Sequence, residues 1–283
     1  MTHTNKHGFP DVESWARHYV LSNDLSVKLS PPRVPESFSN TCTPERLDHP
    51  GRPPSFFTAP RREKTPKPEA LMEPRFRARV LHTFFHHELQ AAELMCWALL
   101  AFCDAELEFR KGLLRICLDE IRHMNLYRVH MEGLGFAPGD FGIRDWFWKR
   151  VPTCPDKISF VAVMGMGFEA ANLEYAPDFA ARFRAVDDET GAVLQERIAD
   201  EELGHVALAT KWFKHWTGGC DFDVWSSHLP PPLSPFVLHG SPIAQNMRLR
   251  AGMTQQFIGD LVAYVPDKKG RPLPASSAAA DDS

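Results

Sequence analysis

The strongest constraint on this chain is a spacing that occurs twice: a glutamate is followed 32 or 33 positions later by a Glu-x-x-His pair. Residues three apart lie on one face of a helix, so the glutamate and histidine of each pair can reach the same point. A repeated spacing of this kind predicts two related pairs of helices. The two copies are Glu88 with Glu120 and His123, and Glu169 with Glu202 and His205.

Each of these polar residues lies in an apolar stripe with the 3-and-4 spacing of a buried helix face. The stripe that contains Glu120 and His123 also holds Leu113, Ile116, Cys117, Met124, Tyr127 and Met131. Proline is sparse between residues 74 and 216, which favours long helices. The sequence predicts an all-α domain with helices near 74–102, 106–134, 156–183 and 187–216.

Six polar groups directed into one core need an electrostatic partner. A buried carboxylate without a counter-charge costs several kcal/mol or becomes protonated, and converging carboxylates repel one another. Two divalent cations offset four glutamates. One glutamate from each of two helices plus Glu-x-x-His from the other two is a known dimetal ligand set. Oxygen and imidazole ligands without thiolates favour two transition-metal ions, iron first and manganese second, over a structural zinc.

Four further residues are candidates for supporting the metal ligands. Histidine ligands usually donate their second ring N–H to a carboxylate or a carbonyl. Asp119 and Glu201 are predicted to accept these bonds across the bundle, with Arg122 beside them. Tyr127 lies two turns beyond Glu120 and is expected either to support the ligands or to act as a redox-active phenol.

Other polar residues near the site have simpler interpretations. Glu93 and Glu174 each follow a candidate ligand by five positions, about 140° around the helix. They are expected to be exposed or to pair with another helix. The neighbouring histidines are expected at the surface or in supporting positions; they are His82, His86 and His87.

The segments that flank the helices have a different composition. Residues 1–73 are rich in proline and predict an N-terminal arm packed on the bundle, with one short helix near Asp11 to Leu21. Residues 217–265 predict a loop followed by an extra C-terminal helix from about Pro242 to Tyr264. The small and polar residues 266–283 predict a disordered tail.

Charge and cysteine content narrow the class of protein. The formal net charge of −4 gives the chain as a whole no basic bias, which argues against a nucleic-acid partner. The six cysteines form no Cys-x-x-Cys pair, which favours free thiols in a reducing compartment. No secretory signal is visible, and the longest apolar stretch, 158–168, is too short to span a bilayer. A cytoplasmic protein without a membrane partner is therefore expected.

Two resemblances extend this interpretation. The string Asp119-Glu120-Ile121-Arg122-His123 resembles the signature of the bacterial multicomponent monooxygenases and related di-iron carboxylate proteins. The second half departs from it, with Glu201 in place of the aspartate and Gly204 in place of the arginine. A wider resemblance covers most of the chain and joins it to the uncharacterised family called domain of unknown function 455, which implies a ferritin-like four-helix bundle. The segments that carry it are 86–94, 144–148, 165–169 and 229–235.

The leading hypothesis is a non-haem di-iron, or mixed manganese and iron, oxidoreductase that oxidises an unidentified small molecule with O₂. Glu88 and His123 are expected to hold one ion and Glu169 and His205 the other, with Glu120 and Glu202 bridging. The four glutamates are also the predicted catalytic residues. Three alternatives stay open: an iron-oxidising or iron-handling protein, a tRNA-modifying hydroxylase, and a metal-free scaffold or interaction module. The sequence does not identify the electron donor or the oligomeric state.

Overall fold

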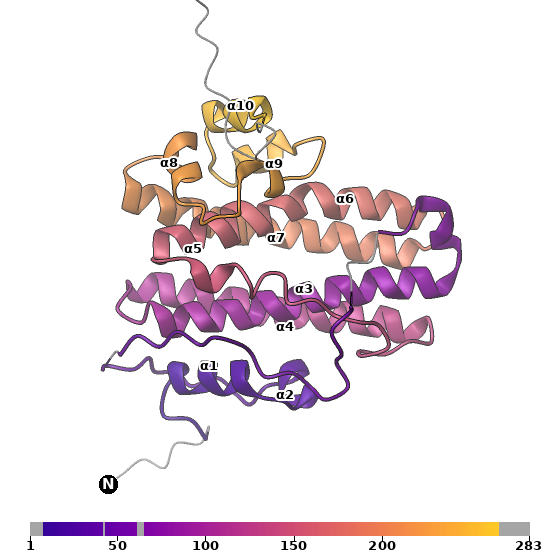
Figure 1. Ribbon diagram of the computed structural model, residues 1–283, viewed down its shortest axis with the longest axis horizontal. Helices are drawn as coiled ribbons and strands as arrows, with labels where there is room; N and C mark the ends of the chain where they lie inside the picture. Colours follow the sequence, from indigo (N-terminus) through magenta and orange to yellow (C-terminus); the bar gives the residue numbers. More distant parts are fainter. Residues whose placement is uncertain (1–7, 42, 61–64, 266–283) are drawn as a thin grey trace, which may run out of the picture.

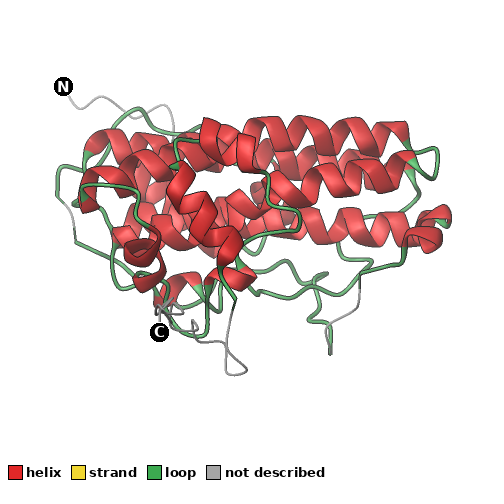
Figure 2. Ribbon diagram, turned by 90° about the horizontal axis from the view of Figure 1, so that it is seen from above, coloured by secondary structure: helices red, strands yellow, loops and turns green. Residues whose placement is uncertain are grey.

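The computed structural model describes residues 8–41, 43–60 and 65–265. Within these ranges the regular structure is helical, and strand-like pairing is limited to an isolated bridge between Thr58 and Ile143 (Figure 2). The prediction of an all-α chain is therefore confirmed. The tail predicted at 266–283 lies outside the described residues.

Long helical segments lie side by side through the centre of the molecule (Figure 1). Their ends fall within two residues of the bounds predicted from the sequence. They are α3 (Pro74–Ala101), α4 (Leu107–Gly133), a composite segment of α5 (Lys157–Val163), η3 (Met164–Glu169) and α6 (Ala170–Arg184), and α7 (Glu189–Thr217).

The long helices form two hairpins that face each other. α3 packs along α4, α6 packs along α7, and α7 also contacts α4 and α5. A long connection between α4 and α5 joins the hairpins and contains the short helix η2 (Val151–Thr153). Each helix pair therefore offers one buried face to the other pair, and the candidate ligands lie on these faces.

Local signals in the sequence explain where the second hairpin begins and ends. Asp156 and Asp188 precede α5 and α7, and their carboxylates accept hydrogen bonds from Ser159 N–H and Gly191 N–H. These bonds satisfy backbone donors that have no partner inside the helix. Gly218 ends α7 with a φ of 80°, a conformation that glycine adopts without a steric penalty.

The N-terminal arm covers the first hairpin. It contains α1 (Val12–Leu21), α2 (Leu25–Leu29) and η1 (Pro68–Met72). α1 packs on α3, and α2 packs on α4. The predicted short helix and its cap are confirmed, because Asp11 accepts a hydrogen bond from Ser14 N–H at 2.8 Å.

The C-terminal segment packs near the second hairpin. It contains α8 (Phe222–Ser227), η4 (Pro235–Val237), α9 (Gln245–Arg250) and α10 (Gln255–Ala263). The prediction of one helix from Pro242 to Tyr264 is wrong, because the chain turns at Gly252, whose φ is 90°. Thr254 then caps α10 by accepting a hydrogen bond from Phe257 N–H.

Burial in the bundle is not purely apolar. α3 is almost completely buried along its second half, yet it carries Glu88 and Glu93 there. Across 8–41, 43–60 and 65–265, no helix is both long enough and apolar enough to cross a membrane.

The cysteines depart in part from the expectation of free thiols. Cys96, Cys117, Cys154 and Cys220 are free and buried. Cys103, in contrast, is disulfide-bonded, so the expectation is wrong at this position. Cys42 lies outside the described residues.

Candidate metal centre

The six candidate ligands converge inside the bundle, and none is more than 4% exposed. They come from every long segment: Glu88 from α3, Glu120 and His123 from α4, Glu169 from η3, and Glu202 and His205 from α7. Within each of two groups, one ligand atom per residue lies within 4.8 Å of the others. The groups are Glu88, Glu120, His123 and Glu202, and Glu120, Glu169, Glu202 and His205. Each could hold a metal ion, and both contain Glu120 and Glu202.

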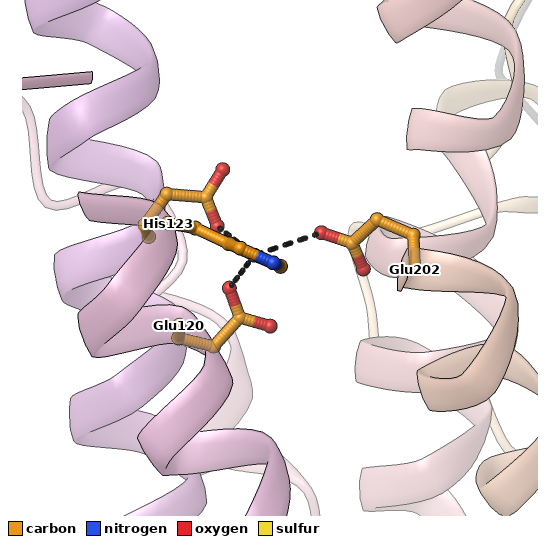
Figure 3. A group of neighbouring side chains, drawn as sticks. Glu120, His123 and Glu202 are labelled. Carbon is orange, nitrogen blue, oxygen red and sulfur yellow. Dashed lines mark hydrogen bonds and ion pairs between the residues drawn. The ribbon is translucent and has the colours of Figure 1, made fainter. Parts of the chain in front are cut away.

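In the first group, His123 Nδ1 lies 3.3 Å from Glu120 Oε2. The same nitrogen lies 4.0 Å from Glu88 Oε2 and 4.0 Å from Glu202 Oε1. Figure 3 shows His123 and Glu120 directed toward Glu202 across the space between the helix pairs. A single position between these atoms is therefore surrounded by one nitrogen and three carboxylates.

The second group repeats the arrangement. His205 Nδ1 lies 3.0 Å from Glu120 Oε1 and 3.0 Å from Glu202 Oε2, and 4.0 Å from Glu169 Oε2. The two imidazole centroids are 5.9 Å apart. The two groups are thus adjacent positions that share a pair of carboxylates.

The outer nitrogen of each histidine faces a carboxylate from the opposite hairpin. His123 Nε2 lies 2.6 Å from Glu201, and His205 Nε2 lies 3.5 Å from Asp119. Arg122 binds both acids, donating to Glu201 at 2.6 Å and to Asp119 at 2.8 Å. These contacts fix the rings with Nδ1 directed inward.

These contacts also keep the two supporting acids ionised. The contact with His205 Nε2 at 3.5 Å and then the hydrogen bond from Arg122 lower the pKa of Asp119 to about 2. Burial acts to raise the pKa of Glu201, but His123 and Arg122 outweigh it and lower the pKa to about 2. Both side chains therefore carry a negative charge at neutral pH and favour the histidine tautomer with a proton on Nε2.

A local change of helix type brings Glu169 into the group. Met164–Glu169 form a π-helical turn, which inserts one residue into the helical repeat and is common at functional sites. Gly165 permits the close approach of α7, because a Cβ at this position would overlap the side chain of Ala209. Sequence periodicity alone did not indicate this turn.

The electrostatics of the cluster fit bound cations. Burial raises the pKa of Glu88 and of Glu169 well above the ordinary value, and repulsion by neighbouring carboxylates raises both further. The pKa of His205 is also raised, since Glu202 and Glu120 outweigh the effect of burial. Among the described residues, Glu169 Oε1 is buried and has no hydrogen-bond partner. Protons or metal ions must therefore neutralise this cluster, and the oxygen and imidazole donors suit metal ions.

Tyr127 does not belong to either ligand group. Its ring is buried, and its hydroxyl donates a hydrogen bond to Gln195 Oε1 at 3.2 Å. Burial raises the pKa of Tyr127 well above its usual value, and the charge of Glu88 adds to the effect. The phenol therefore stays protonated. Gln195 was not singled out from the sequence, although its position seven residues before Glu202 placed it on the same face.

A small cavity of about 10 Å³ lies beside the second group, with room for about one water molecule. Glu169 and His205 contribute its polar walls, and the rest of its lining is apolar or glycine. The lining includes Met95, Phe109, Leu113, Ile116, Phe160, Val161, Met164, Gly165, Leu208 and Ala209.

Glu93 is not a ligand and is not exposed. Its carboxylate is buried and lies 2.8 Å from Lys28 Nζ and 2.5 Å from Arg52 Nη1, both from the N-terminal arm. Trp148 Nε1 donates a third bond at 2.9 Å. Of the two expected roles, exposure is wrong and pairing with another helix is confirmed, because Lys28 belongs to α2; the sequence did not indicate that this helix and Arg52 lie in the N-terminal arm.

Glu174 has the corresponding role in the second hairpin. It is also buried, and Arg248 of α9 binds it with Nε at 2.8 Å and Nη2 at 2.9 Å. The backbone N–H groups of Gly240 and Ala244 complete its environment. Each hairpin thus carries a buried glutamate five residues after a candidate ligand, and each glutamate is neutralised by a flanking segment.

The histidines of α3 lie deeper than expected. His82 and His86 are only 1% and 3% exposed, so of the two expected roles, at the surface or in supporting positions, the surface role is wrong for them. His82 Nε2 accepts a hydrogen bond from Gly139 N–H at 3.0 Å. His86 Nε2 lies 3.2 Å from Asp145, which also binds Arg52. Both histidines therefore contact the connection between α4 and α5 and hold it against α3.

No curated protein and no solved structure matches the chain. A family model described as "Protein of unknown function (DUF455)" matches residues 13–259. This range includes α1 except for its first residue, all of α2, the four long segments and the six converging side chains. Because the match covers most of the sequence, the chain belongs to the DUF455 family.

Proposed function

We propose that this protein is a ferritin-like di-metal carboxylate oxidoreductase that uses O₂ to oxidise a small molecule. The observation that carries the proposal is the pair of buried ligand groups that share Glu120 and Glu202. Two facing helix hairpins that contribute Glu, Glu-x-x-His, Glu and Glu-x-x-His are the arrangement of ferritin-like dimetal proteins.

The geometry supports a division of the ligands between two ions. Glu88 and His123 would hold one ion, Glu169 and His205 the other, and Glu120 and Glu202 would bind both. Iron is the first choice and manganese the second, because the donors are carboxylate oxygens and imidazole nitrogens. When bound, such a pair of ions supplies the redox chemistry.

The chain itself would contribute orientation and exclusion of water. Asp119 and Glu201 hold the outer nitrogens of the histidines, so Nδ1 of each ring stays directed at the ions. The apolar walls of the cavity keep bulk water from Glu169 and His205. Tyr127 stays a protonated hydrogen-bond donor at the other end of the site.

Metal analysis of anaerobically purified protein tests this proposal. We expect close to two transition-metal ions per chain in the wild type and a marked loss in Glu120→Ala, because Glu120 belongs to both groups. Glu196→Ala is the matched control, since Glu196 is an exposed residue of the same helix as Glu202 and pairs with Arg184. A wild-type protein that folds but binds no transition metal would refute the proposal.

One observation favours a second candidate, an iron-oxidising protein without an organic substrate. The cavity beside Glu169 and His205 has room for about one water molecule, which is too small for an organic substrate. Steady oxidation of added Fe(II) by O₂ without a further substrate would select this candidate. Consumption of O₂ that depends on an added organic compound would select the first.

A further inference from the structure

We propose that the two ends of the site differ in function, and that a small nonpolar ligand of the size of dioxygen enters only at the end formed by Leu113, Gly165 and Ala209. This inference rests on the proposed dimetal function and adds to it the side of entry and the ligand class. It follows from comparing positions that the internal repeat makes equivalent.

The first end is filled. Tyr127 follows Glu120 by seven residues, Gln195 precedes Glu202 by seven, and Phe84 precedes Glu88 by four. The Tyr127 hydroxyl binds Gln195 at 3.2 Å, and its ring lies 5.4 Å from that of Phe84. A large aromatic side chain and a buried hydrogen bond therefore occupy the space next to Glu88 and His123.

The second end has small or aliphatic residues at the equivalent positions. Ala209 follows Glu202 by seven residues, Leu113 precedes Glu120 by seven, and Gly165 precedes Glu169 by four. All three line the cavity beside Glu169 and His205. Ala209 thus stands where the other half has Tyr127, Leu113 where it has Gln195, and Gly165 where it has Phe84. These smaller or aliphatic residues leave a cavity at the second end, whereas large side chains fill the first end.

The contacts of the ligands show the same difference. His123 Nε2 lies 2.6 Å from Glu201, whereas the contact of His205 Nε2 with Asp119 is 3.5 Å. Glu169 Oε1 is buried and has no hydrogen-bond partner among the described residues. The Glu169 and His205 position therefore has the longer outer contact and this unpaired carboxylate oxygen, and it is the position with room beside it.

The cavity also restricts the class of ligand. Apart from Glu169 and His205, its walls offer carbon, sulfur and glycine backbone, so a hydrated anion or a polar substrate would lose hydrogen bonds on entry. Its volume of about 10 Å³ admits a water-sized molecule. A nonpolar diatomic gas satisfies both restrictions.

Xenon uptake by crystals of the metal-free protein tests the entry side without any metal chemistry. Apolar protein cavities bind xenon. Because xenon is larger than water, we expect a xenon site beside Ile116 and Ala209 in Leu113→Ala, where the shorter side chain enlarges the cavity, and none in Leu113→Phe. Leu81→Phe is the matched control, because Leu81 is buried on α3 and does not line the cavity. A xenon site beside Tyr127, or equal occupancy in the two Leu113 variants, would overturn the inference.

Oxidation of the Fe(II)-loaded protein by O₂ provides the second test. We expect Leu113→Phe to slow the oxidation roughly tenfold or more at unchanged iron content, and Leu81→Phe to leave the rate unchanged. An unchanged rate in a folded, fully loaded Leu113→Phe protein would refute entry at this end. The proposed function fails separately, by absence of bound metal in the wild type, so the two failures are distinguishable.

Discussion

Glu201 of α7 holds His123 of α4 by its outer nitrogen at 2.6 Å, and Arg122, next to His123 in the chain, binds the same carboxylate. Two helices from different hairpins are thereby linked through the ring that faces the first ligand group. Outer-shell carboxylates of this kind usually change metal affinity 10- to 100-fold when they are removed.

We therefore expect Glu201→Ala to weaken metal binding roughly 10- to 100-fold without unfolding the protein. Competition with a chelator of known affinity measures the change. Asp200→Ala is the control, because Asp200 is an exposed neighbour on the same helix. Equal affinities in the two variants would contradict a supporting role for Glu201.

The Glu174–Arg248 pair predicts a large loss of stability when one partner is removed. Arg248→Met would leave Glu174 buried with only two backbone N–H donors. Removing one partner of a buried pair costs about 3–5 kcal/mol, so we expect a loss near the lower end of this range.

Urea unfolding measures this loss, and two further variants make the result specific. Arg184→Met removes two exposed ion pairs, with Glu189 and Glu196, and should still cost less than about 1 kcal/mol. Changing Glu174 to Gln in the Arg248→Met protein should restore part of the stability, because it removes the uncompensated charge. A double variant less stable than Arg248→Met would show that the unpaired charge is not the cause of the loss.

His82 predicts a dependence of stability on pH. Burial, assisted by repulsion from His86, lowers the pKa of His82 to about 4. The neutral ring accepts the bond from Gly139 N–H, and a protonated ring cannot. Between about pH 6.5 and 4 the unfolded chain binds more protons than the folded chain, so the contribution of His82 falls as the pH falls through this window.

The shift corresponds to roughly 3 kcal/mol at full effect. We expect His82→Gln to be less stable than the wild type at pH 7.5, and the difference to shrink by about 2–3 kcal/mol at pH 4.5. Urea unfolding of both proteins at each pH checks this. A difference that does not vary with pH would show that His82 does not titrate as described.

Gly165 and Gly204 predict opposite results for the same substitution. Gly165→Ala would place a Cβ against Ala209, so we expect a loss of about 1–3 kcal/mol from overpacking and weaker metal binding through displacement of α7. A Cβ added at Gly204, which lies inside α7, would meet no atom within 4 Å, so Gly204→Ala should stabilise by up to about 1 kcal/mol. Thermal unfolding and metal titration measure both effects, and equal behaviour of the two variants would contradict the role given to Gly165.

The sequence predicted the parts of the structure that depend on helical periodicity. The four long segments, and the convergence of Glu88 with Glu120 and of Glu169 with Glu202, follow from apolar spacing and from the internal repeat. A Glu-x-x-His pair in a core stripe indicates a neutralising partner nearby, because an isolated buried carboxylate is costly.

Other features of the structure could not be predicted from the spacing of apolar residues along the helices. Lys28 and Arg52 reach Glu93 from a proline-rich segment whose path over the bundle has no periodic signal. The π turn at Met164–Glu169 inserts one residue into the helical repeat. It lies in a continuous apolar stretch, so no change in the pattern of apolar and polar residues indicates its position. The break at Gly252 did have a signal, a glycine followed two residues later by a capping threonine.

The glutamates Glu93 and Glu174 limit how this protein can be divided. A fragment of residues 74–216 would keep both carboxylates but would lose the cations at positions 28, 52 and 248 that neutralise them. We therefore expect the four long helical segments to fold poorly on their own, and expression trials should retain both flanking segments. A chimera that contained only these four helical segments would bury the carboxylates of Glu93 and Glu174 without their counter-charges.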